Sequence, residues 1–231
     1  MTRVLMVVSA ADTLVLADGS EHPTGFWAEE VAASHETLAG AGVEIDIATP
    51  GGRRPTVDAL SLSEQGGVQA EDAERFRAYL ATLEEQLDHP LVLADADPSA
   101  YDAVYIPGGH APMTDLVEDP ALAAILTATD SAGRPVVALC HGVAGLLAAT
   151  GEGGWLFGGR RMTGFTDTEE QQGGYGDSIP FSVEQRMRAA GGVVETGEPW
   201  SDTVVVDGTL ITGQNPQSSV STAKALLERL A

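Results

Sequence analysis

Four short apolar runs, each followed by small or turn-forming residues, limit most strongly how this chain can fold. They are RVLMVVSA (3–10), VEIDIATP (43–50), DAVYIPGG (102–109) and RPVVALC (134–140). Runs of this length are typical of strands buried on both faces of a parallel sheet. In such a sheet the loops at the carboxyl ends of the strands carry the functional groups.

Helical patterns alternate with these runs. Residues 25–42 place apolar side chains at helical spacing and end in glycine, and residues 118–133 begin with acidic residues and Pro120. An acidic start, an early proline and a terminal glycine are helix boundary signals. The alternation predicts an α/β fold with a doubly wound, mostly parallel sheet flanked by helices.

The length of 231 residues and the hydrophobic content of 43% fit a single domain, 1–231. Residues 55–100 interrupt the alternation and are expected to form an inserted segment packed on that domain. We expect it to contain a loop, an amphipathic helix over 68–87 and a connector. Beyond residue 140 the patterns predict a strand at 160–165, a loop or short helix at 166–177, helices at 181–192 and 215–231, and an Asp-Gly hairpin at 204–212.

The charge and the single cysteine exclude several classes of partner. With 34 acidic and 12 basic residues the net charge is -22, which repels nucleic acid and anionic lipid. No apolar stretch reaches the roughly 18 residues of a membrane span. One cysteine excludes an internal disulfide, and the first apolar run lacks the features of a signal peptide. We therefore expect a cytoplasmic protein without a membrane or nucleic-acid partner.

Cys140 stands where an apolar strand gives way to a helical pattern, and His141 and Gly142 follow it directly. This is the layout of a nucleophile elbow, in which a helix N-terminus lowers the thiol pKa and supplies an oxyanion donor. The alternative is that Cys140 is a small buried filler. The layout favours the nucleophile.

The segment IPGGHAP, 106–112, follows the third predicted strand. Gly108 and Gly109 suit either an oxyanion hole or a plain tight turn, because glycine permits a close backbone approach. His110 is either a second histidine of the site or a solvated loop residue. From the residues alone we favour the solvated loop residue.

Acidic residues occur at two further places near the predicted strand ends. Glu29 and Glu30 open the first helix, where carboxylates ordinarily complement the helix dipole, and only one of them can face the sheet edge. A second acidic group follows the predicted strand 160–165 and could orient a histidine; it comprises Asp167, Glu169 and Glu170. In a chain this acidic, an ordinary solvated loop is the better interpretation of that group without further support.

The positions of the histidines narrow the choice of base. The five are His22, His35, His89, His110 and His141, so none lies downstream of residue 141. A triad whose histidine follows the nucleophile at a distance is excluded, and only His141 or His110 can serve as base. No two histidines have a familiar ligand spacing, so we expect no metal.

Several of these motifs occur together and in order: the first helix with its TGFWAEE start, PGGH, CHG about thirty residues later, TGF with its acidic cluster, and VVVDGTLITGQNPQSS. In this combination the chain resembles the ThiJ/PfpI superfamily, which has a flavodoxin-like fold shared with class I glutamine amidotransferases. It is most similar to the branch of glutathione-independent glyoxalases and heat-inducible chaperones.

The resemblance implies roles for individual residues. Cys140 would be the nucleophile, His141 its base and Glu170 the acidic partner. Glu30 would hydrogen-bond the cysteine, and the backbone N–H groups of Gly109 and His141 would hold an oxyanion. Gly108 and His110 would join Gly109 in binding the oxyanion or the substrate. Val143, Ala111 and Ser34 depart from the usual proline, glycine and proline, which affects backbone stiffness more than chemistry.

The resemblance further implies conversion of methylglyoxal to lactate without a cofactor, metal or glutathione. The partner would be a small dicarbonyl substrate, and a homodimer is compatible with the family. Three alternatives stay open: a stress-related holdase with a redox-sensing cysteine, a cysteine amidase or peptidase, and a redox-responsive regulator. The sequence does not decide whether residues 55–100 cover the site.

Overall fold

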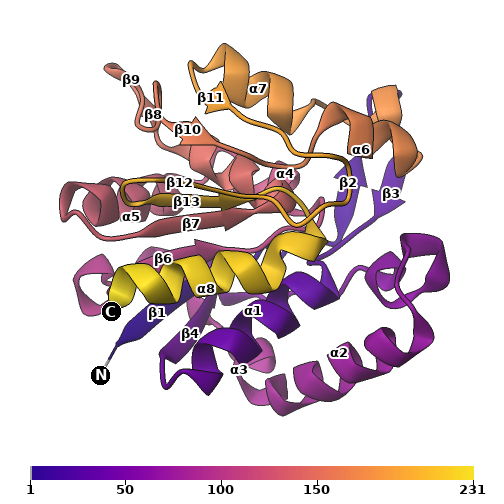
Figure 1. Ribbon diagram of the computed structural model, residues 1–231, viewed down its shortest axis with the longest axis horizontal. Helices are drawn as coiled ribbons and strands as arrows, with labels where there is room; N and C mark the ends of the chain where they lie inside the picture. Colours follow the sequence, from indigo (N-terminus) through magenta and orange to yellow (C-terminus); the bar gives the residue numbers. More distant parts are fainter. Residues whose placement is uncertain (1) are drawn as a thin grey trace.

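A central sheet with helices on both faces forms the body of the computed structural model, which describes residues 2–231 (Figure 1). The sheet has seven strands in the order β12-β13-β7-β6-β1-β4-β5. They are β1 (Arg3–Val7), β4 (Glu44–Thr49), β5 (Leu91–Val92), β6 (Ala103–Ile106), β7 (Val136–Leu139), β12 (Val204–Asp207) and β13 (Leu210–Gly213). Within this seven-stranded sheet only the β12–β13 pair is antiparallel. The predicted fold class is confirmed.

Alternate side chains of the central strands enter two separate cores. In β1, Leu5 and Val7 belong to one apolar cluster, whereas Val4 and Met6 belong to the other. Because strand side chains alternate between the two faces, a continuous apolar run fits a strand covered on both sides. This explains why the central strands could be recognised from short runs without alternation.

Helices cover both faces of the sheet (Figure 1). On the face of Val4 pack α1 (Ala28–Gly40), α2 (Ala70–Thr82), α3 (Glu84–Asp88) and α8 (Ser219–Leu230). On the face of Leu5 pack α4 (Pro112–Asp115), α5 (Pro120–Ser131) and α7 (Val183–Ala189). The remaining α-helix of the described residues is the short α6 (Asp167–Gln172). No described helix is both long and apolar enough to cross a membrane.

The segment 55–100 is more closely joined to the sheet than its sequence indicates. The helix expected over 68–87 is divided into α2 and α3 at Leu83. The expected connector contributes β5, which pairs in parallel with β4 at the sheet edge. A two-residue strand is too short for its hydrophobic pattern to be recognised.

The remaining strands form small sheets outside the main one. They are β2 (Thr13–Val15) with β3 (Glu21–Pro23), β8 (Thr150–Gly151) with β9 (Gly154–Trp155), and β10 (Arg161–Met162) with β11 (Val193–Val194). The predicted hairpin is confirmed by the β12–β13 pair, with Gly208 at φ 60 in its turn. The two turn residues are Gly208 and Thr209, so glycine occupies the first central position, where such a two-residue turn requires a positive φ.

Two neighbouring strands place the conspicuous motifs side by side. β6 ends at Ile106 before the two glycines, and β7, its parallel neighbour, ends at Leu139 before the cysteine. Since the carboxyl ends of parallel strands lie at the same sheet edge, both loops open in the same direction. That edge is where the candidate site lies.

Candidate active site

Cys140 lies on a sharp turn between β7 and the 3₁₀ helix Cys140–Ala148. Its φ is 56, a left-handed value that a non-glycine residue adopts only at a cost. The turn is possible because Gly142 packs against the β6 backbone, where a Cβ would meet the Ile106 carbonyl oxygen at 2.3 Å. The thiol is 3% exposed and lines a cavity, so Cys140 is buried but faces open space.

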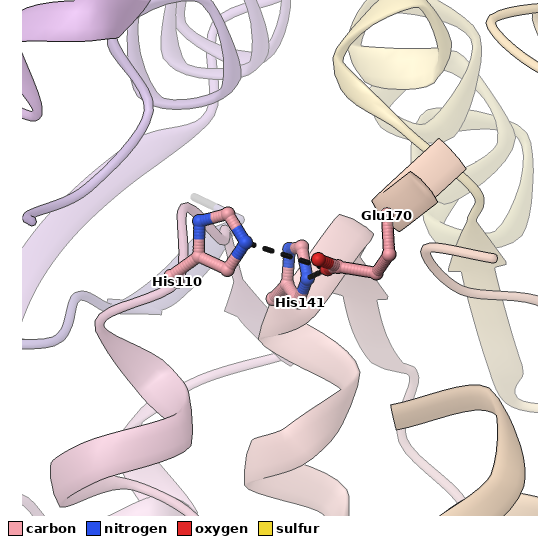
Figure 2. Close-up of side chains that lie close together, drawn as sticks. All are labelled: His110, His141 and Glu170. Carbon is pink, nitrogen blue, oxygen red and sulfur yellow. Dashed lines mark hydrogen bonds and ion pairs between the residues drawn. The ribbon is translucent and has the colours of Figure 1, made fainter. Parts of the chain in front are cut away.

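A linear chain of side chains connects the thiol to an acid. Cys140 Sγ lies 3.5 Å from Nδ1 of His141. The other ring nitrogen of His141 hydrogen-bonds Oε1 of Glu170, which is carried by α6 (Figure 2). An imidazole held between a nucleophile and a carboxylate can accept the nucleophile's proton in a fixed orientation. The structure thus brings together three residues that the resemblance singled out.

His110 lies beside this chain, and its assignment to a solvated loop is wrong. The side chain is buried, and Nε2 lies 3.3 Å from the same oxygen of Glu170 (Figure 2). Its ring centroid is 4.1 Å from that of His141 and 4.6 Å from that of Tyr175. The physical reason is that α4 begins directly after the glycine turn and Tyr175 covers the loop, which local sequence does not reveal.

Glu30 approaches the thiol from the first turn of α1. It is fully buried, and Oε2 accepts a hydrogen bond of 2.6 Å from the Gly108 N–H. Burial raises the pKa of Glu30 to about 8, so the carboxyl is protonated at neutral pH. Of the two glutamates that open the helix, Glu30 therefore faces the sheet edge, while Glu29 lines the cavity.

The charge states differ from the expected thiolate. Burial first, and then the neighbouring Glu30, raises the pKa of the Cys140 thiol well above its ordinary value. Burial and the adjacent His110 lower the pKa of His141. Burial alone would raise the pKa of Glu170, but the two histidine rings outweigh it and hold that pKa below its usual range. The resting site is a neutral thiol beside a neutral imidazole, so the expectation of a lowered thiol pKa is wrong.

The two glycines of the β6 loop have different roles. The N–H of Gly108 is occupied by Glu30 and is not free to bind an oxyanion. The N–H of Gly109 has no protein partner within residues 2–231, and Gly109 lines the cavity. Gly109 has φ 88, and a Cβ there would meet the Gly25 carbonyl oxygen at 2.3 Å. The backbone N–H of His141 contacts the sulfur of Cys140.

The acidic cluster after residue 165 is not an ordinary solvated loop. Glu169 is fully buried, and its carboxylate accepts hydrogen bonds from five donors. They are Thr166 N, Thr166 Oγ1, Trp200 N, Gln214 Nε2 and Asn215 Nδ2. Sequence reasoning missed this role, because three of the five donors come from residues 31 to 46 positions away. The one local signal was Thr166 three residues before a glutamate, the spacing of a capping box.

Trp200 is the second residue that the sequence did not indicate. Among residues 2–231, Cys140 and Trp200 are the two non-glycine residues with positive φ, and both line the cavity. Trp200 is held by its backbone N–H to Glu169 and by its indole N–H to Gln172, at 2.8 and 2.6 Å. Strained residues concentrate at functional sites.

The cavity in front of the thiol has a volume of about 650 Å³. One wall contains Gly109, His110, Cys140 and His141. A further part of the lining comes from the segment 55–100, which thus borders the cavity in front of the thiol. Its lining residues there are Leu60, Gln65, Gly66, Gly67, Val68, Gln69, Asp72 and Phe76.

The histidine spacing did not anticipate one further arrangement. His110, His141 and Glu170 each offer a potential metal-ligand atom, and these atoms lie within 4.8 Å of one another. They come from three separate segments, namely the loop before α4, the 3₁₀ helix after β7 and α6, so a search for short sequence spacings could not detect them. The chemical use that follows directly from their geometry is the shared carboxylate described above.

Comparisons with known proteins agree with this architecture. The model of the DJ-1/PfpI family matches residues 23–229. A bovine (Bos taurus) protein, glutamine amidotransferase-like class 1 domain-containing protein 1, is 34% identical over 83% of this chain and 82% of its own. Glyoxalase 3 of Candida albicans is 29% identical over 98% of both chains. The crystal structure of glyoxalase III from Candida albicans superimposes with a TM-score of 0.83 at 28% identity, covering 98% of this chain and 96% of that one. The chain therefore belongs to the DJ-1/PfpI family.

Proposed function

We propose that this protein is a glutathione-independent glyoxalase that converts methylglyoxal to lactate. The observation that carries the proposal is the buried chain of Cys140, His141 and Glu170, with a protonated Glu30 beside the thiol. Relatives similar over the whole chain support it, since they are named glyoxalase 3 and glutathione-independent glyoxalase HSP31.

The first step is addition of the thiol to the aldehyde carbon. His141 Nδ1 accepts the thiol proton as the sulfur attacks, because a thiol with a raised pKa needs an adjacent base. The carbonyl oxygen becomes an alkoxide, which the Gly109 N–H can stabilise before it takes the proton back from His141. The product is a hemithioacetal on Cys140.

The second step moves a proton between the two carbonyl carbons. His141, oriented by Glu170, removes the proton from the sulfur-bearing carbon to form an enediolate and returns it to the neighbouring carbon, while the proton of the hemithioacetal hydroxyl moves to the oxygen on that neighbouring carbon. The result is a lactoyl thioester, which water hydrolyses to lactate and free Cys140. Across the cycle, methylglyoxal and one water give lactic acid. One carbon is oxidised while its neighbour is reduced, so the electrons balance within the substrate.

The environment of the site accounts for two features of this reaction. Glu30 is kept protonated by burial and can donate to the sulfur, which favours the neutral adduct over a buried thiolate. Cys140 itself supplies the thiol that other routes take from glutathione.

A cytoplasmic location and a homodimeric state remain predictions.

The decisive experiment incubates the purified protein with methylglyoxal and measures lactate. We expect turnover that Cys140→Ala abolishes, and that His141→Ala lowers by roughly 10²- to 10⁴-fold, the usual contribution of a general base. The matched control is His89→Ala, since His89 is exposed and does not line the cavity. Absence of lactate formation by the folded wild-type protein would refute the proposal. Faster hydrolysis of amide substrates would favour the amidase alternative.

A further inference from the structure

The cavity is much larger than the substrate of the proposed reaction. Methylglyoxal has only five non-hydrogen atoms, whereas the cavity has a volume of about 650 Å³. Cavities of roughly 300–1,000 Å³ ordinarily hold ligands of drug size. A small dicarbonyl at Cys140 would leave most of this volume to water, so the remaining walls indicate what else the substrate carries.

Aromatic side chains form part of these walls. Five of them line the cavity, namely Trp27, Phe76, Phe165, Tyr175 and Trp200. Phe165 stands next to the reacting groups, with its ring centroid 4.4 Å from that of His141, and Trp200 meets Phe165 edge-to-face at 5.5 Å. Aromatic rings pair favourably in offset and edge-to-face arrangements. A planar ring attached to the dicarbonyl would find such partners.

The backbone at Trp200 is consistent with a role for its side chain. Trp200 keeps a positive φ of 61 and a side chain that is 38% exposed at the cavity. Buried Glu169 holds its N–H, and Gln172 holds its indole. A large exposed apolar ring kept in a strained conformation has no value for the core, whereas it extends the aromatic wall beyond Phe165.

Charge in the cavity is of one sign. Apart from the two site histidines, the acidic residues of its lining are Glu29 and Asp72, near the starts of α1 and α2. Burial, and then the charge of Asp72, raises the pKa of Glu29 to about 7, so Glu29 is partly ionised at neutral pH and carries a full charge above it. No lysine or arginine lines the cavity in the part of the chain that the structure describes. The polar remainder consists largely of amides, Gln65, Gln69, Gln172 and Gln217. Such a lining disfavours an anionic substituent and accepts a neutral or cationic one.

We propose that the preferred substrates are α-oxoaldehydes whose ketone carbon bears an aromatic, non-anionic substituent, with the ring lying against the wall that Phe165 and Trp200 form together. The proposal rests on the proposed function and keeps its chemistry. An aryl oxoaldehyde and one water give the corresponding aryl hydroxy acid, through the same thioester on Cys140. Recognition of the ring lowers KM, because the ring is bound in both the ground state and the transition state.

The test compares three compounds with the same purified protein: methylglyoxal, phenylglyoxal and 4-carboxyphenylglyoxal. Initial rates of hydroxy acid formation are normalised to each compound's reactivity toward a small free thiol. We expect kcat/KM for phenylglyoxal to exceed that for methylglyoxal by about tenfold or more, chiefly through KM. The carboxylate compound should fall about tenfold below phenylglyoxal, and Glu29→Gln should narrow that gap.

Two variants test whether the preference for an aromatic substituent arises in the cavity. Trp200→Ala should lower the ratio of kcat/KM for phenylglyoxal over methylglyoxal several-fold. Phe181→Leu is the matched control, because Phe181 is a partly buried ring that does not line the cavity. A ratio unchanged in Trp200→Ala, or a wild-type ratio below one, would overturn this inference while methylglyoxal turnover keeps the glyoxalase proposal intact. Loss of all three activities would overturn both.

Discussion

Individual residues at this site are held in states that they would not adopt in water. Cys140 has a left-handed backbone, Glu30 keeps its proton, and Gly109 stands where no Cβ fits. Each feature depends on full burial or on close backbone packing rather than on the residue itself. The most informative single change is therefore one that alters protonation and little else.

Glu30→Gln is that change. In the wild type, Glu30 ionises near pH 8, and the new charge both removes a donor and raises the pKa of the neighbouring thiol. We expect kcat/KM to fall above about pH 8 in the wild type, and Glu30→Gln to lack that alkaline limb. A pH–rate profile from pH 6 to 9.5 measures this, and an identical limb in the variant would contradict it.

The same residue predicts a pH dependence of stability. The pKa of Glu30 is about 8 in the folded protein and 4.5 as its ordinary value, so between them the native state holds a proton that the unfolded state has lost. Stability therefore decreases as pH rises through this window. Urea unfolding at pH 5 and pH 8 should show a smaller decrease in Glu30→Gln. Glu36→Gln, exposed on the same helix, is the control.

At the scale of elements, α6 positions the acid of the site. Its first turn is closed by a capping box between Thr166 and Glu169, and Glu169 also binds the loops that carry Trp200 and Asn215. Glu170 follows Glu169 on this helix and reaches both histidines. The buried carboxylate of Glu169 therefore fixes α6, and with it Glu170, to the loops at the carboxyl end of the sheet.

Glu169→Ala should consequently reduce both stability and activity. Five donors would lose their acceptor, and leaving buried polar groups unpaired after breaking such a network costs about 3 kcal/mol or more. We expect a loss of this size in urea unfolding and a lower kcat, because α6 no longer holds Glu170. Glu228→Ala, exposed on α8, should change stability by less than about 0.5 kcal/mol. A loss below about 1 kcal/mol for Glu169→Ala would show that the network is not essential.

At the scale of the whole molecule, the charge of -22 works against the compact state. Salt shortens the screening length from about 30 Å at 0.01 M to about 3 Å at 1 M. We expect Tm to rise by about 2–4 °C or more between these NaCl concentrations, corresponding to about 1 kcal/mol. Near the isoelectric point of about 4.3 the dependence should be much weaker. A fall of Tm with salt at neutral pH would contradict this account.

The sequence by itself determined the sheet, its flanking helices and the position of the nucleophile. Apolar runs of fixed length and helical spacings are local properties, so β1, β4, β6 and β7 could be predicted within a few residues. Cys140 could be placed because a strand-to-helix turn with small neighbours is also local. Ser34 hydrogen-bonds the buried Tyr105 hydroxyl at 2.8 Å, a partner that only the fold reveals.

Only the tertiary structure decided the protonation of the site, its second histidine and the part of the cavity lining that residues 55–100 provide. The raised pKa of the thiol follows from desolvation, which depends on every surrounding element and not on neighbours in sequence. His110, His141 and Glu170 meet because three segments far apart in the sequence converge at one sheet edge, and packing of the segment 55–100 brings some of its residues to the same cavity. Periodic patterns determine which face of an element is buried, but packing between distant segments determines what that face meets.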